Sequence, residues 1–104
     1  MANEIRILSK ARTDIVELAT YIGRDSVDAA NRFLDATDET FAMLAQQPFL
    51  GAEYPGRKPR LDGIRVFRVK KFPNHLAFYI AREDGIEVVR VLHGARDLDT
   101  ALDE

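Results

Sequence analysis

The chain has 104 residues and no cysteine, with 46% hydrophobic and 31% charged side chains. This composition is typical of a globular protein with one core, and it argues against disorder, disulfides and thiolate chemistry. No apolar run approaches the roughly 20 residues that cross a bilayer, and the first residues do not resemble a signal peptide. We therefore expect one cytoplasmic domain over residues 1–104 and no membrane partner.

The net charge of −2 conceals a segregation of charge along the chain. The segment 57–71 is strongly basic, whereas the segments on either side of it are acidic. Its basic residues are Arg57, Lys58, Arg60, Arg65, Arg68, Lys70 and Lys71, against the single acid Asp62. Such a segment suggests a docking surface for an anionic partner, although a charge run is also common on a solvated face.

The first half of the chain predicts a strand and a helix. Residues 5–8 form a short apolar run, which is typical of an opening strand. Ser9 is expected to cap a helix that ends at Gly23. Its apolar residues recur at helical spacing, and they are Ala11, Ile15, Leu18 and Ile22.

A second helix is predicted to follow almost at once. Ser26 is a suitable N-cap, and Asp28 lies in the first turn, where the helix dipole favours negative charge. The helical pattern continues until Gln47 and Pro48, where proline ends it. Because only residues 23–25 connect the two helices, we expect an antiparallel hairpin that covers one face of a sheet.

Three strands are predicted within residues 63–98, after a proline-rich loop over residues 48–62. Each run is rich in Val, Ile, Phe and Tyr; Pro73-Asn74 separates the first two runs, and residues 83–85 separate the last two. Such short connections join antiparallel neighbours. The predicted fold is α+β: an N-terminal strand, a two-helix hairpin on a mainly antiparallel four-stranded sheet, and a short helix within residues 96–102.

The last predicted strand carries aliphatic residues toward both faces of the sheet. Val88 and Val89 are adjacent, as are Val91 and Leu92. One helical hairpin covers only one face, so the other face either awaits a partner or is closed by the tail and the proline-rich loop. The sequence leaves both possibilities open.

This order of elements resembles the toxins of the ParE/RelE superfamily, which belong to bacterial type II toxin–antitoxin pairs. The resemblance covers nearly the whole chain and rests on the order and spacing of several short motifs. They are Ile7-Leu8-Ser9-Lys10-Ala11, Asp14, Tyr21-Ile22, Phe33-Leu34, Pro48 with Gly51, Gly63-Ile64-Arg65, and the segment from Arg90 to Leu98. The resemblance implies a toxin neutralised by a cognate antitoxin, ParD-like or related, whose C-terminal segment folds as it wraps the toxin.

The superfamily has two functional branches, one of which inhibits DNA gyrase without cleavage, whereas the RelE-like branch cleaves mRNA on the ribosome. Residues that could serve the nuclease chemistry are Arg65, Arg90, His93 and Arg96, with His75 as a further candidate. His93 suits an acid–base role near neutral pH, or a structural hydrogen bond. An acidic protein of pI about 5.7 is poorly suited to threading between ribosomal RNA elements. We therefore expect the ParE-like, non-enzymatic branch; a toxin that has lost activity and persists as a binding module is a third possibility.

The sequence also suggests two sets of contact residues. Candidates for target binding are Arg57, Lys58, Arg60, Arg96, Leu98 and Leu102. Candidates for antitoxin binding are Phe67, Val69, Phe78 and Ile80. Neither a metal nor a cofactor is expected, because the two histidines have no carboxylate pair at ligand spacing near them. Direct nucleic-acid binding is left open.

Overall fold

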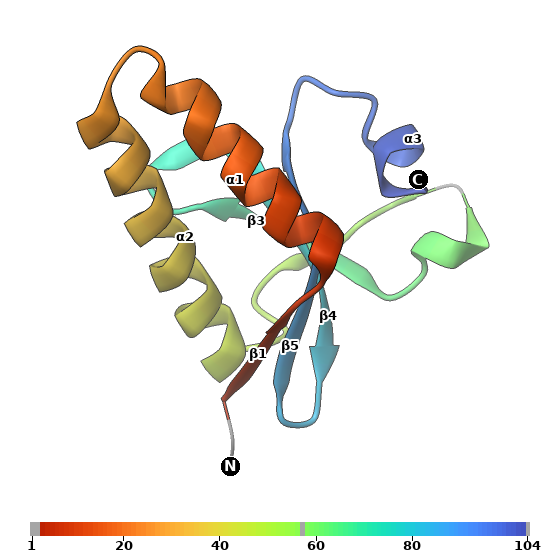
Figure 1. Ribbon diagram of the computed structural model, residues 1–104. Coiled ribbons are helices and arrows are strands. Elements are labelled where there is room, and N and C mark those ends of the chain that lie inside the picture. The colour runs from red at the N-terminus through yellow and green to blue at the C-terminus, as the bar shows by residue number, and fades with distance from the viewer. Residues whose placement is uncertain (1–2, 57, 104) are drawn as a thin grey trace.

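The computed structural model describes residues 3–56 and 58–103. The elements in chain order are β1 (Glu4–Ile7), α1 (Ser9–Gly23), α2 (Val27–Gln46), β2 (Ala52–Glu53), a 3-10 turn (Pro59–Leu61), β3 (Ile64–Val69), β4 (Phe72–Arg82), β5 (Gly85–His93) and α3 (Leu98–Leu102). Helices α1 and α2 form a hairpin on one side of the sheet, and α3 lies on the other side (Figure 1). None of the described helices is long and apolar enough to cross a membrane.

The sheet confirms the predicted α+β class and adds one strand. Its order is β1-β5-β4-β3-β2, with β1 parallel to β5 and every other pair antiparallel. The fifth strand, β2, falls in the segment predicted as a loop. It has only two residues, Ala52 and Glu53, which pair with Val66 and Arg65. A strand of two residues is too short to show the alternation of apolar and polar residues that predicts a strand.

Of the two predicted helix N-caps, one is confirmed and the other is wrong. Ser26 caps α2 as predicted, because its Oγ accepts a hydrogen bond from the Ala29 amide at 3.1 Å. Ser9 does not cap α1, and Leu8 occupies that position instead. The Leu8 amide donates to the Val88 carbonyl at 3.0 Å, so Leu8 still belongs to the sheet when the helix begins. The helix therefore starts one residue earlier than a side-chain cap at Ser9 would allow.

The predicted turn at Pro73-Asn74 was wrong. The chain turns at Lys70 and Lys71, where Lys71 has φ 67°, and Pro73 lies within β4. The register of β3 and β4 shifts beside Val69, so residues 73–75 have no partner on β3. A proline is tolerated there because its missing amide is not needed for the ladder.

The main core fills the space between the hairpin and the sheet. Its largest members are Phe33, Phe41 and Leu44 of α2, together with Tyr79 of β4 and Ile86 of β5, all fully buried or nearly so. This core fixes the hairpin-facing side of the sheet and leaves the α3 side for other contacts.

Candidate partner-binding face

An irregularity in the β4–β5 ladder gives the sheet its second apolar face. The register shifts at Val89, which adds one residue to β5. Val88 and Val91 consequently both belong to the core beneath the hairpin. Val89 and Leu92 belong to a second cluster on the opposite face. The expectation of aliphatic side chains on both faces of this strand is confirmed.

We call this second surface the α3 face. Its buried members come from the 3-10 turn, the sheet and α3, and they are Leu61, Ile64, Phe78, Leu92 and Ala101. The proline-rich loop and the tail therefore both cover part of the face, which was one of the two possibilities that the sequence left open. The cover is incomplete, because a groove remains on each side of α3.

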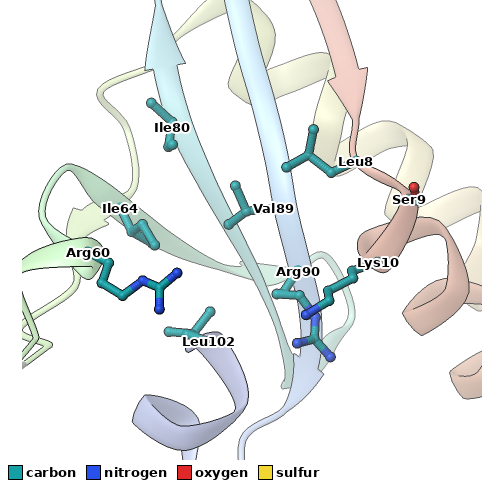
Figure 2. A pocket seen from close by; sticks show the side chains of 9 residues that line it. All are labelled: Leu8, Ser9, Lys10, Arg60, Ile64, Ile80, Val89, Arg90 and Leu102. Carbon is teal, nitrogen blue, oxygen red and sulfur yellow. The ribbon is translucent and has the colours of Figure 1, made fainter. Parts of the chain in front are cut away.

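The first groove lies between the start of α1, the sheet and the C-terminal end of α3, and has a volume of about 600 Å³ (Figure 2). Ile64, Ile80 and Val89 form its floor, one from each of three adjacent strands. Lys10 and Arg60 approach it from opposite sides (Figure 2). The groove therefore combines an aliphatic floor with a basic rim.

The second groove lies at the other end of α3 and has a volume of about 560 Å³. Val66, Leu76 and Leu98 line it, together with Leu50 from the loop after α2. Arg68 is the one charged residue in its lining. Such a surface is suited to an apolar side chain of a partner.

The C-terminal end of α3 is tied to the proline-rich loop by charge. Lys58 Nζ donates to a carboxylate oxygen of Asp103 at 2.8 Å, and Arg60 lies 3.3 Å from the other oxygen. The hydrogen bond from Lys58 lowers the pKa of Asp103, and the same bond raises the pKa of Lys58. Exposed pairs of this kind contribute little to stability, so their main effect is to position α3.

The other end of α3 has two further polar contacts. Tyr54 donates a hydrogen bond to the Asp99 carboxylate, and burial together with this bond raises the pKa of Tyr54 to about 12. Asp97 caps the helix by accepting hydrogen bonds from the amide and the hydroxyl of Thr100 at 3.4 and 2.9 Å. Polar contacts thus hold α3 at both ends.

An ion pair between Asp14 and Arg90 supports the face from beneath. Arg90 Nε and Nη2 donate to the two Asp14 oxygens at 2.7 and 2.9 Å. Asp14 also accepts the Val91 amide at 3.0 Å, and Arg90 Nη1 donates to the Ala101 carbonyl at 2.7 Å. One pair therefore connects α1, β5 and α3.

The candidate nuclease arginines have separate structural contacts. Arg90 is held by Asp14 and Ala101, as described above. Arg65 instead donates to the carbonyls of Gly51 and Phe49, at 2.6 and 3.4 Å, and so holds the loop after α2. The two guanidinium groups therefore do not meet at one site.

The candidate histidines form a cross-strand pair at the end of the sheet. His75 and His93 are register partners with ring centroids 5.1 Å apart. His93 Nδ1 accepts the Ala95 amide at 3.1 Å, while the His75 ring packs 5.1 Å from Phe33. Burial and the neighbouring His93 lower the pKa of His75. These contacts favour a structural role for His93. Arg96 follows in the exposed connector.

The basic segment does not form one surface. Lys58 and Arg60 pair with Asp103 at α3, whereas Lys70 lies 3.5 Å from Glu39 of α2. Arg57 lies outside the described residues. The target-binding candidates Lys58 and Arg60 thus lie beside α3, whereas Lys70, on the hairpin side, is not one of those candidates.

The apolar candidates lie mostly around α3. Leu102 lines the first groove and Leu98 lines the second. Among the antitoxin-binding candidates, Ile80 forms part of the first groove, and Phe78 is fully buried beneath α3.

Two further antitoxin-binding candidates face the hairpin. Val69 is buried in the main core, and Phe67 packs against that core and also lines the second groove. The four candidates are therefore spread over both faces.

Sequence analysis did not identify the contacts of Asp14, Tyr54 and Asp103. Asp14 carried a usable signal, since it lies on the same helical face as Ala11 and Ile15, where an acid requires a buried partner. The partners of Tyr54 and Asp103 are 45 positions away, and no local pattern connects them. Within residues 3–56 and 58–103, no group of three or more His, Asp or Glu side chains is arranged to hold a metal.

Comparison with known proteins gives one family and a matching fold. The family model for the ParE toxin of the type II toxin–antitoxin system parDE matches residues 5–98. A solved structure described as a chromosomal ParDE TA system from P. aeruginosa aligns with a TM-score of 0.67 and 19% identity, over 86% of this chain and 94% of that chain. At this identity the structural match supports the fold alone. No curated protein matched the sequence.

Proposed function

This chain belongs to the ParE toxin family of type II toxin–antitoxin systems, and from that premise we propose that it inhibits DNA gyrase and is neutralised by an antitoxin bound on the α3 face. The observation that carries the proposal is the incomplete cover of that face. Two grooves of about 600 and 560 Å³ flank α3, and aliphatic side chains line both. A chain that carries such grooves is suited to binding another protein.

The lining of the two grooves suggests the chemistry of an antitoxin segment that would fit them. The first groove offers the aliphatic floor of Ile80 and Val89 beside the cations Lys10 and Arg60. A helix with an apolar stripe and flanking carboxylates complements both features. A segment that is disordered alone and folds on binding covers two grooves at once, one on each side of α3.

The target is a protein rather than ribosomal RNA. The acidic chain has a pI of about 5.7, which opposes a close approach to a phosphate lattice. The arginines that a nuclease would need are engaged elsewhere, Arg90 with Asp14 and Arg65 with the loop after α2. A non-enzymatic inhibitor requires neither group to be free.

Substitution at the floor of the first groove tests the antitoxin site. We expect Ile80→Glu to weaken antitoxin binding by at least about 100-fold, because it places a charge on the apolar floor. Val16→Glu is the matched control, since Val16 is an exposed aliphatic residue of α1. Titration calorimetry measures both affinities. Equal affinity of the two variants would show that the antitoxin binds elsewhere.

Capture of the target from purified components tests the other part of the proposal. Immobilised, antitoxin-free toxin is expected to retain gyrase subunits and not 70S ribosomes. Prior binding of the antitoxin should abolish that retention. Retention of ribosomes without gyrase would favour the nuclease alternative.

A further inference from the structure

Phe49 and Leu50 present two large apolar side chains at the edge of the sheet, in the loop between α2 and β2. Phe49 is 73% exposed, the highest value among the large apolar residues that the structure describes, and Leu50 is 44% exposed. A single exposed apolar residue is common on protein surfaces and needs no explanation. The loop that carries these two is different because of how firmly it is held.

Polar side chains of the sheet hold the loop in one conformation. The Tyr79 hydroxyl accepts the Gly51 amide at 2.8 Å and donates to the Pro48 carbonyl at 2.8 Å. Arg65 donates to the Gly51 carbonyl at 2.6 Å. Gly51 has no room for a side chain, because a Cβ would lie 2.5 Å from the Tyr79 hydroxyl oxygen. The loop is thus anchored on both sides of Phe49.

The same anchor places a cation against the exposed ring. The Arg65 guanidinium carbon lies 4.8 Å from the centroid of the Phe49 ring. Among the described residues no carboxylate pairs with Arg65, whose hydrogen bonds go to neutral carbonyls. An aromatic ring and an arginine held together in advance resemble the small groups of residues that carry most of the energy in protein interfaces.

The loop also adjoins the proposed antitoxin site without belonging to its floor. Leu50 lines the second groove, whereas Phe49 does not. An antitoxin segment seated in that groove would reach Leu50 and obstruct the approach of another protein to Phe49. This position allows neutralisation without any direct contact to the ring.

We propose that Phe49, backed by Arg65, is a contact point for the protein that this toxin inactivates. The target's site for this ring is an apolar pocket with a carboxylate at the rim, which complements both the ring and a guanidinium that no carboxylate of the described residues pairs with. The proposal rests on the proposed function only in requiring a protein target. It does not require that the target be gyrase.

Phe49→Ser is the test, with Tyr21→Ser as the matched control. Tyr21 is also an exposed aromatic residue beside an arginine, 68% exposed and with the Arg24 guanidinium carbon 5.7 Å from its ring centroid, but it lies on α1. Growth arrest on expression without antitoxin and inhibition of purified gyrase report activity. Calorimetry with the antitoxin and the thermal midpoint report neutralisation and folding.

We expect Phe49→Ser to reduce growth arrest and gyrase inhibition by about tenfold or more, with antitoxin affinity and thermal midpoint unchanged. Phe49→Tyr should restore activity, and Tyr21→Ser should leave it intact. Full activity of Phe49→Ser would overturn the inference, and so would a loss of antitoxin binding alone. If the unmodified chain arrests growth without affecting gyrase, the proposed target fails, while the growth-arrest comparison still decides the role of Phe49. Absence of growth arrest by the unmodified chain would overturn both.

Discussion

The guanidinium of Arg90 and the carboxylate of Asp14 form a two-point ion pair between residues 76 positions apart, with N–O distances of 2.7 and 2.9 Å. The two side chains are only 11% and 8% exposed. Because Arg90 also donates to the Ala101 carbonyl, the pair links α3 to α1 and to β5. An arginine that the sequence suggested for catalysis thus has a structural role in the observed fold.

Removal of Asp14 is therefore predicted to be costly. Asp14→Ala leaves the Arg90 charge and the Val91 amide without their partner, and we expect a loss of about 3–5 kcal/mol in the free energy of unfolding. Glu17→Ala, at an exposed position one turn along α1, should change stability by less than about 0.5 kcal/mol. Urea denaturation measures both. Similar small effects of the two substitutions would contradict this role for the pair.

Tyr79 is predicted to stabilise the loop after α2 through its hydroxyl group. Tyr79→Phe leaves the Gly51 amide and the Pro48 carbonyl unpaired, and should cost about 1–3 kcal/mol. Tyr21→Phe removes the same group from an exposed site and should be neutral within about 0.5 kcal/mol. Hydrogen exchange should show faster exchange of the Gly51 amide in Tyr79→Phe alone. Unchanged protection of that amide would mean that the loop is held by other contacts.

The pattern of apolar residues was sufficient to predict the fold, but not the exact starts of the helices or the position of the turn before β4. Ser26 and the apolar spacing of α2 act locally, so the second helix was predicted with its start. Ser9 was misassigned because the Leu8 amide is bonded to Val88, a partner 80 residues away that no local rule reveals. Pro73 was predicted to lie in a turn because proline is uncommon inside strands. A proline fits within β4 here only because the register shifts beside Val69, and the sequence does not show that shift.

The candidate site was predicted only in outline, for a related reason. Two apolar faces and a short terminal helix follow from composition and spacing. Side chains alternate between the two faces of a strand, so the pairing of the strands decides which antitoxin-binding candidates face α3. These candidates are Phe67, Val69, Phe78 and Ile80. The sequence grouped these four residues together, although alternation along a strand separates 67 and 69 from 78 and 80 once the pairing is known.

Stability is predicted to fall in mild acid because of His75. Burial and the neighbouring His93 lower its pKa, so the unfolded chain binds the proton more readily than the folded chain. This contribution is present above the ordinary histidine value of 6.5 and declines as pH falls below it. Urea denaturation at pH 7.5 and pH 5 should show a larger loss for the unmodified chain than for His75→Leu. Equal losses would remove His75 as the cause.

Toxicity is predicted to be insensitive to the His93 imidazole. His93→Gln retains a polar side chain at the end of β5 and removes any acid–base chemistry, so growth arrest should stay within about twofold of the unmodified chain. A nuclease that relied on this residue would lose about 100-fold or more. Viable counts after induction without antitoxin distinguish the two. A loss on that scale in a folded variant would reopen the endonuclease alternative.

The most direct test of gyrase inhibition is the reaction of purified gyrase with supercoiled and relaxed DNA in the presence of antitoxin-free toxin. We expect that supercoiling stops, that DNA ends covalently linked to gyrase accumulate, and that antitoxin added beforehand prevents both effects. Unimpaired supercoiling at saturating toxin, together with mRNA cleavage when the same preparation is added to translating ribosomes, would contradict it.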